Sequence, residues 1–295
     1  MVAHWIRGLA TLIFLPLLAQ TSSEKIMLWP TGSGQTRQGP SVVMTTQGKV
    51  TQVNAPFLTL YSPKTFNGKT VLIAAGGGYR RIEQAKEALP AAQFLTQHGF
   101  RAYILTYRLP NSHWPEGKDV AMKDVRQALT LIHQDNPYLS VLGFSAGAHL
   151  LALAINRAEM TPKDDKAPLA VEGMALIYPI VSVEPPFNHS ATHRVLAGRH
   201  ASRQEEAKWS VQHAIHDHSP PLFVVESEDD PIAPPQNGLL LHRAATQHHV
   251  PMTWIRYATG GHGFGLGRKG LANSAWPEHY LSWLNQLPAH NCRGN

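Results

Sequence analysis

A serine between two glycines has the setting in this sequence that most clearly predicts chemistry. The Gly-x-Ser-x-Gly pentapeptide around Ser145, residues 143–147, follows an apolar run at 139–144 and leads into small, helix-compatible residues at 146–154. A strand, a sharp turn and a helix form a nucleophile elbow, in which the residues two positions from the serine need almost no side chain. An ordinary turn between a strand and a helix is the alternative. The pattern favours a nucleophile if a base, an acid and an oxyanion hole are also present.

A base and an acid follow the serine in the order that this chemistry needs in a parallel sheet, namely Ser, acid, His. Asp229 and Asp230 come at the end of an apolar run, and His262 lies in a glycine-rich segment after the next strand-like run. Pro231 favours an extended backbone at the residue before it. Asp230 is therefore preferred to Asp229 as the acid. The outside candidates for this role are Glu226 and Glu228.

Three consecutive glycines, Gly76 to Gly78, follow an apolar run at 70–75 that is typical of a buried parallel strand. Glycines at this place let the backbone approach a ligand and point amide N–H groups at it. The spacing of a phosphate-binding loop is missing, so an oxyanion hole is favoured over phosphate binding, with a flexible turn as the alternative. From their positions, Tyr79, Arg80 and Trp209 are candidates for lining the substrate pocket.

The elements that must position these residues alternate between strands and helices. Strands are expected at 50–61, 70–75, 100–107, 139–144, 171–180, 221–225 and 252–257. Helices are expected at 91–98, 119–135, 146 to about 159, 236–249 and 274–287. This alternation predicts an α/β protein with a mostly parallel, doubly wound sheet and helices on both faces. One domain at 24–295 is expected, with a small cap-like insertion at about 182–219.

The histidines of the insertion raise the question of a metal site. His213, His216 and His218 lack a regular ligand spacing, and Asp217 is the only carboxylate among them. A solvated surface is therefore preferred to a metal site, and no cofactor is expected.

Composition and charge exclude several classes of protein. The chain of 295 residues is 43% hydrophobic and 16% charged, as is typical of a globular protein. The formal charge of +6 is dispersed, whereas nucleic-acid binding needs clustered basic residues. The single cysteine, Cys292, allows no intrachain disulfide and no cysteine-based zinc site.

The N-terminal segment has the pattern of an export signal. His4 and Arg7 precede an apolar run at 8–19, which is shorter than the roughly 20 residues that a membrane-spanning helix needs. Residues 1–23 are therefore predicted to be a signal peptide, for which Ala19 suits the last removed position. We expect a periplasmic or secreted protein without stable membrane insertion; an uncleaved anchor is the alternative.

Taken together, the motifs resemble a known group of enzymes, the carbohydrate esterases of the α/β-hydrolase fold that are acetyl-xylan-esterase-like, feruloyl-esterase-like or dienelactone-hydrolase-like. The resemblance covers about residues 50–287 and implies Ser145 as nucleophile, Asp230 as acid and His262 as base. The motifs that carry it are AAGGGY (74–79), YRL (107–109), GFSAGAHL (143–150), SPPLFVVESEDDPIAP (219–234) and GGHGFGLG (260–267).

The same resemblance implies the donors of the oxyanion hole, namely the amides of Gly77, Gly78 and Ala146. The sequence departs from the group at one place, because related esterases often have His or Pro before the three glycines, where this chain has Ala75. The departure bears on the rigidity of the loop and not on the presence of the amides.

The resemblance implies a serine carboxylic-ester hydrolase for short-chain or acetylated carbohydrate esters, working through a covalent acyl-enzyme. A serine peptidase of the same fold is one alternative, although such peptidases usually carry a propeller domain for which this sequence has no room. A non-catalytic binding protein with a relic site is the other. The sequence does not indicate an oligomeric state.

Overall fold

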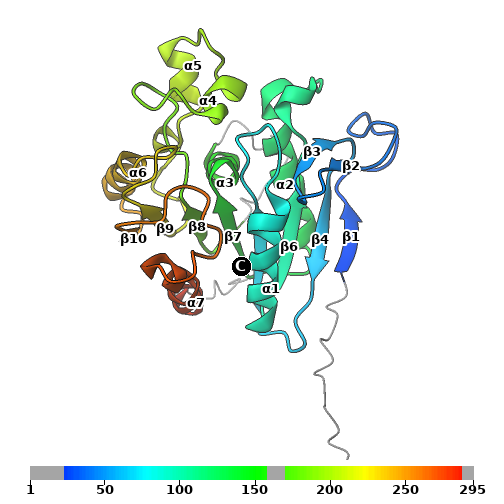
Figure 1. Ribbon diagram of the computed structural model, residues 1–295. Coiled ribbons are helices and arrows are strands. Elements are labelled where there is room, and N and C mark those ends of the chain that lie inside the picture. The colour runs from blue at the N-terminus through cyan, green and yellow to red at the C-terminus, as the bar shows by residue number, and fades with distance from the viewer. Residues whose placement is uncertain (1–22, 158–169, 288–295) are drawn as a thin grey trace, which may run out of the picture.

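An eight-stranded sheet runs through the middle of the protein (Figure 1). The computed structural model describes residues 23–157 and 170–287. The strands of this sheet are β1 (Ser23–Met27), β4 (Phe57–Tyr61), β5 (Thr70–Ala74), β6 (Arg101–Thr106), β7 (Leu139–Phe144), β8 (Met174–Ile177), β9 (Leu222–Ser227) and β10 (Met252–Tyr257). Their order is β1-β4-β6-β5-β7-β8-β9-β10, and neighbours from β6 to β10 are parallel, whereas the β1–β4 and β4–β6 pairs are antiparallel.

The central strands are buried along their whole length. Every residue of β5, β7, β8 and β9 is buried, which accounts for their continuous apolar sequences. The predicted strand at 171–180 is shorter than expected, because Tyr178 has a φ of 39° and turns the chain after β8. The mostly parallel, doubly wound sheet that the sequence predicts is confirmed.

The expected single strand at 50–61 is wrong. The segment forms β3 (Val50–Val53), which pairs with β2 (Val42–Met44) in a separate ribbon, and β4 of the main sheet. Asn54 ends β3, because its side chain donates to the carbonyl of Pro40 at 2.9 Å. Pro56 then has no N–H to contribute to a continuous ladder.

Helices cover both faces of the sheet. They are α1 (Leu89–Gln97), α2 (Val120–His133), α3 (Ala146–Asn156), α6 (Gln236–Gln247) and α7 (Trp276–Gln286). The helices α1 and α7 lie on one face and α2, α3 and α6 on the other (Figure 1). The helix predicted from 146 to about 159 ends at Asn156, and residues 158–169 lie outside the described part of the chain.

The cap segment, residues 182–219, connects β8 to β9 beyond the carboxyl ends of the parallel strands (Figure 1). Its two short helices are α4 (Ala191–Leu196) and α5 (Arg203–Lys208). Each begins with a serine whose hydroxyl accepts a backbone N–H of the first turn: Ser190 from His193, and Ser202 from Glu205.

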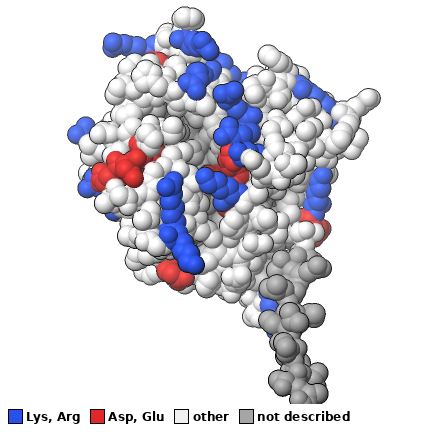
Figure 2. All heavy atoms as spheres, viewed as in Figure 1, with Lys and Arg blue, Asp and Glu red and all other residues white. Residues whose placement is uncertain are grey.

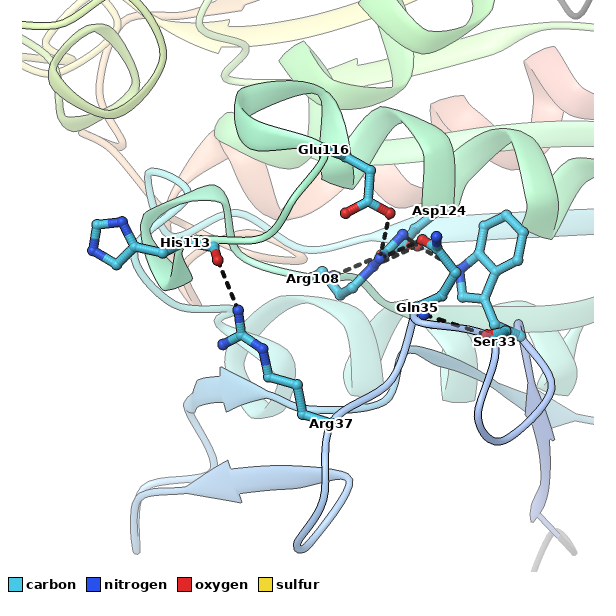
Figure 3. Close-up of polar contacts among 8 residues, drawn as sticks. Ser33, Gln35, Arg37, Arg108, His113, Glu116 and Asp124 are labelled. Carbon is cyan, nitrogen blue, oxygen red and sulfur yellow. Dashed lines mark hydrogen bonds and ion pairs between the residues drawn. The ribbon is translucent and has the colours of Figure 1, made fainter.

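A buried arginine after β6 ties the N-terminal loop to α2 (Figure 3). Arg108 has no exposed side-chain surface, and its Nη2 donates to Asp124 Oδ1 at 2.7 Å. Its Nη1 donates to Gln35 at 2.7 Å and to Glu116 at 3.0 Å, and Trp29 Nε1 donates to Asp124 at 2.8 Å. The N-terminal loop is thereby joined to α2 and to the segment between β6 and α2 around one guanidinium group.

The predicted signal peptide, residues 1–23, lies outside the described residues except for Ser23, which begins β1. Within residues 23–157 and 170–287, no helix combines the length and the apolar character needed to cross a membrane.

Candidate active site

Ser145 lies in a strained turn between β7 and α3, with φ 49° and ψ −117°. A non-glycine residue in such a conformation costs about 1–3 kcal/mol and persists only where its surroundings fix it. Here the Ser145 N–H donates to the Ile177 carbonyl at 2.9 Å, and the Ser145 carbonyl accepts from the His149 N–H at 3.1 Å. These two bonds hold the serine at the carboxyl end of β7.

The two glycines of the pentapeptide are required by close backbone contacts. A Cβ atom on Gly143 would lie 2.4 Å from Ala148 Cα, and one on Gly147 would lie 2.2 Å from the Ala74 carbonyl oxygen. Both distances are far inside van der Waals contact. The elbow therefore has room for a side chain at Ser145 and for none at the two glycines.

The structure brings Ser145, His262 and Asp230 into one chain of hydrogen bonds. Ser145 Oγ lies 2.8 Å from His262 Nε2, and His262 Nδ1 lies 2.7 Å from Asp230 Oδ2. The Asp230 side chain is fully buried, and its Oδ1 accepts the N–H groups of Ile232 at 2.8 Å and Ala233 at 2.9 Å. The carboxylate is thus fixed on one side by the backbone and faces the imidazole on the other.

Asp229 contacts the histidine loop, residues 260–267, in a different way. Its Oδ1 accepts the Gly261 N–H at 2.7 Å, and this bond holds the pKa of the exposed Asp229 carboxyl below its ordinary value. Gly261 and Gly263 have φ values of 60° and 68°, which glycine adopts without strain. Asp230 therefore contacts the side chain of His262, whereas Asp229 contacts the backbone beside it.

The other two acids considered from the sequence bond to residues other than His262. Glu226 accepts from Trp254 Nε1 at 3.0 Å, and Glu228 forms an ion pair with Arg256 at 3.2 Å.

The glycine loop, Gly76–Gly78, and the start of α3 flank Ser145. Gly77 and Gly78 have φ values of 126° and 64°, and a Cβ on Gly77 would lie 2.2 Å from the Arg81 carbonyl oxygen. Ala146 is the first residue of α3, where N–H groups have no acceptor within the helix and the helix dipole favours negative charge. The amides expected to bind an oxyanion thus belong to segments on either side of the serine.

A buried carboxyl group lies behind the glycine loop. Glu87 Oε2 accepts the Gly76 N–H at 2.6 Å, and Glu87 Oε1 accepts the Tyr178 hydroxyl at 3.0 Å. The same hydroxyl accepts the Gly265 N–H at 3.1 Å, and the Tyr178 ring lies edge-on to His262 with centroids 5.1 Å apart. Burial raises the pKa of Glu87 to about 7. Glu87 and Tyr178 together connect the glycine loop to the histidine loop.

The assignment of Tyr79 and Trp209 to the substrate pocket needs correction. Tyr79 is 2% exposed, and its hydroxyl lies 2.8 Å from His149 Nδ1. Trp209 is 1% exposed, and its carbonyl oxygen lies 2.8 Å from His149 Nε2. His149 of α3 is thus bonded to the Tyr79 hydroxyl, next to the glycine loop, and to the backbone of Trp209 in the cap segment. Arg80 is exposed and is not among the residues that line the cavity beside Ser145.

That cavity has a volume of about 260 Å³ and opens above Ser145 and His262. Arg81, Glu83 and Lys86, which follow the glycine loop, line one side of it. Figure 2 shows basic and acidic side chains next to each other near the middle of this face of the molecule. The cap segment lines the other side through Ser190–Thr192.

The sequence model of the BD-FAE family matches residues 58–245, which is more than half of the chain. The chain belongs to the BD-FAE family. The carboxyl ends of β5, β7 and β9 and the whole glycine loop lie inside the matched region, whereas His262 lies beyond it.

Two curated relatives of this BD-FAE chain are longer proteins. The acetylxylan esterase of Xylanibacter ruminicola is 24% identical over 275 residues, which are 90% of this chain and 54% of that protein. Endo-1,4-beta-xylanase B of Butyrivibrio fibrisolvens is 26% identical over 206 residues, which are 65% of this chain and 32% of that protein. The chain thus spans about half, or less, of the length of these relatives.

Solved structures show the same fold. The acetyl ester-xyloside bifunctional hydrolase of Caldicellulosiruptor lactoaceticus aligns with a TM-score of 0.72 and 24% identity, covering 89% of this chain and 95% of that one. A thermophilic esterase of Thermogutta terrifontis aligns with a TM-score of 0.65 and 19% identity, covering 86% and 97%. This BD-FAE family member has the α/β-hydrolase fold.

Sequence reasoning missed Glu87 and Tyr178 in this BD-FAE chain. Glu87 lies in a π-helical turn, η1 (Gln84–Ala88), among other polar residues, and nothing in that pattern predicts its burial. Tyr178 lies near the end of the apolar run at 171–180, which predicts a strand. The one available signal was the position of Tyr178 at the carboxyl end of a central strand, where side chains of parallel sheets meet ligands.

Proposed function

We propose that this BD-FAE family member is a serine carboxylic-ester hydrolase that acts on short-chain or acetylated carbohydrate esters. The observation that carries the proposal is the hydrogen-bonded chain from Ser145 Oγ through His262 to Asp230 at 2.8 and 2.7 Å. A serine with a base in reach and a buried carboxylate behind that base is the arrangement needed for acyl transfer.

In the first half of the reaction, Ser145 Oγ attacks the ester carbonyl and its proton passes to His262 Nε2. Asp230 accepts a hydrogen bond from Nδ1–H of His262, which holds the ring in the required tautomer and stabilises the imidazolium. His262 then gives its proton to the departing alcohol, and the acyl group remains on Ser145. In the second half, water attacks this acyl-enzyme with His262 again as base, and the acid is released.

The negative charge that develops on the carbonyl oxygen needs donors already in place. The amides of Gly77, Gly78 and Ala146 are the proposed donors, and each such donor is typically worth about 3 kcal/mol in the transition state. The N-terminal end of α3 adds the favourable field of its dipole.

The substrate class is supported by the relatives. One is named an acetylxylan esterase and another an endo-1,4-beta-xylanase, so both names refer to xylan. A cavity of about 260 Å³ with charged groups on its rim suits a small acyl group attached to a polar alcohol.

The test is turnover of p-nitrophenyl acetate and acetylated xylan by the purified chain and by Ser145→Ala. We expect the substitution to lower kcat by at least about 10³-fold. Ser282→Ala is the matched control, because Ser282 is exposed on α7 and should keep full activity. Equal rates for the wild type and Ser145→Ala would contradict catalysis by this serine and favour a binding protein. Cleavage of peptides without cleavage of esters would favour a serine peptidase.

We further propose that residues 1–23 contain a secretory signal and that the protein is periplasmic or secreted. The support is the apolar run at 8–19 after His4 and Arg7. Removal after Ala19 would leave all of β1 in the mature protein, because β1 begins at Ser23. N-terminal sequencing of the exported protein tests this, and a retained Met1 would contradict it.

A further inference from the structure

A second cavity adjoins the one beside Ser145 and is not used by the chemistry described above. Its volume is also about 260 Å³, and it shares Ser190, Ala191 and Ile232 with the first cavity. The two cavities are therefore adjacent, and a molecule with its reacting carbonyl at Ser145 lies next to the second one.

The turn that fixes the acid also presents an apolar side chain to both cavities. Asp230 Oδ1 accepts the N–H of Ile232 at 2.8 Å, so the backbone of Ile232 is held by the same carboxylate that faces His262. Ile232 is nevertheless 53% exposed, which is the largest exposure among the big hydrophobic residues in the described part of the chain. Because its backbone is held and its side chain is exposed in the lining of both cavities, Ile232 offers an apolar surface to a molecule bound there.

The cap segment supplies the opposite wall, which is also held in place. Phe187 and Pro186 line the second cavity, and Arg194 Nη1 donates to the His189 carbonyl at 2.6 Å across the loop between them and α4. Ala191 packs against the glycine loop, since a Cβ on Gly78 would lie 2.6 Å from Ala191 Cβ. The cavity is thus bounded by fixed segments on both sides.

The chemistry of the two cavities differs. Arg81, Glu83 and Lys86 bring charge to the first cavity. The second is lined mainly by aliphatic, aromatic and proline side chains. Its polar side chains are those of His189, Ser190 and Arg194, and the Arg194 guanidinium donates to the His189 carbonyl. Such a surface favours an uncharged group with an apolar face over a charged group.

We propose that the second cavity binds the larger half of the ester, as an uncharged ring whose apolar face packs on Ile232 and Phe187. The proposal rests on the proposed function, because the ring is placed by an ester carbonyl at Ser145. Both a sugar ring of the alcohol half and an aromatic ring of the acyl half have this chemistry. The second cavity then favours substrates that carry such a ring, whatever ester bond reacts at Ser145.

The experiment compares kcat/KM for a ring-bearing ester with kcat/KM for ethyl acetate, in the wild type, Ile232→Ala and Phe187→Ala. We expect each substitution to lower this ratio about tenfold, mainly through KM. Leu239→Ala is the matched control, because Leu239 is an exposed apolar residue on α6 and should leave the ratio unchanged.

Two ring-bearing esters distinguish the source of the ring. A lower ratio for acetylated xylobiose alone identifies a sugar of the alcohol half, and a lower ratio for methyl ferulate alone identifies an aromatic acyl group. An unchanged ratio for both esters in both variants would overturn the inference while leaving the esterase intact. Failure of the wild type to hydrolyse ethyl acetate, or hydrolysis that survives Ser145→Ala, would instead reject the proposed function.

Discussion

Tyr178 donates its hydroxyl proton to the buried carboxyl group of Glu87 at 3.0 Å. Through this bond the end of β8 is connected to the segment that carries the glycine loop, because Glu87 also accepts the Gly76 N–H at 2.6 Å. The Tyr178 hydroxyl in turn accepts the Gly265 N–H of the histidine loop. The positions of the proposed oxyanion donors and of the base therefore depend on a shared set of hydrogen bonds.

Tyr178→Phe should lower kcat about three- to tenfold with little change in KM, because it removes one hydrogen bond that positions groups used in the transition state. Glu87→Gln should have a similar effect, and the double variant should lose less than the product of the two. Steady-state kinetics on p-nitrophenyl acetate measures all three. Tyr280→Phe is the matched control, since the buried Tyr280 hydroxyl has no hydrogen-bond partner among the described residues. Fully multiplicative losses would argue against a shared network.

Substitution of Asp229 and substitution of Asp230 should have clearly different effects on kcat. Asp230→Asn should lower kcat on the order of 10⁴-fold, because the amide no longer holds the required His262 tautomer. Asp229→Asn should cost far less, since its carbonyl oxygen can still accept the Gly261 N–H that Asp229 accepts at 2.7 Å. Measurement of kcat for both variants decides the matter, and a larger loss at Asp229 would reject Asp230 as the acid.

The contribution of Glu226 to the free energy of unfolding should fall as the pH rises. Burial raises the pKa of Glu226 from 4.5 to about 8, so between these values the folded chain keeps a proton that the unfolded chain has lost. The contribution to the free energy of unfolding is fully present below pH 4.5 and is lost as the pH rises through about 8. The slope is at most about 1.4 kcal/mol per pH unit.

Urea unfolding of Glu226→Gln at pH 5 and pH 8 tests this expectation. The variant should show a smaller fall in stability between the two pH values than the wild type. Glu228→Gln is the control, because Glu228 lies two residues away and its side chain is 44% exposed in an ion pair with Arg256. An unchanged pH dependence in Glu226→Gln would show that another group is responsible.

Arg108→Ala should destabilise the fold by about 3–5 kcal/mol, because it leaves the carboxylate of Asp124 buried without its charged partner. Arg243→Ala, at an exposed position on α6, should change stability by no more than about 0.5 kcal/mol. Chemical denaturation of the two variants gives the comparison. A small effect at Arg108 would mean that Glu116 and Trp29 rearrange around the vacancy.

The sequence predicted the sheet well where its signals are local. The strands β7 and β10 coincide with the expected 139–144 and 252–257. For β7 the signal is its uninterrupted apolar sequence, which a strand buried on both faces needs. The break between β3 and β4 was missed, because the bond from Asn54 to Pro40 that ends β3 joins residues that no periodicity connects.

The residues of the candidate site likewise fall into those that local sequence signals predict and those that they do not. Ser145 and His262 have neighbours that must be glycine, and this requirement can be recognised from the sequence alone. The positions of Tyr79 and Trp209 in the sequence predict a place at the pocket, yet both side chains are buried. Tyr79 bonds to His149 and Trp209 Nε1 donates to Glu205. Whether a polar or aromatic side chain faces a cavity or a buried partner depends on contacts between distant segments, which single-residue patterns do not contain.

The contact between Ala191 and Gly78 joins the cap segment to the glycine loop. Substrate range, which the cap affects, and turnover, which the glycine loop affects, are therefore linked. The first residue of α4 rests on the glycine loop, where even one added methyl group would collide. A cap segment transplanted from a relative would bring its own residue against this loop and shift it. Substitutions in the cap segment that change the range of substrates must therefore keep a small residue at position 191. A cap with a larger residue there would change the specificity and lower the turnover.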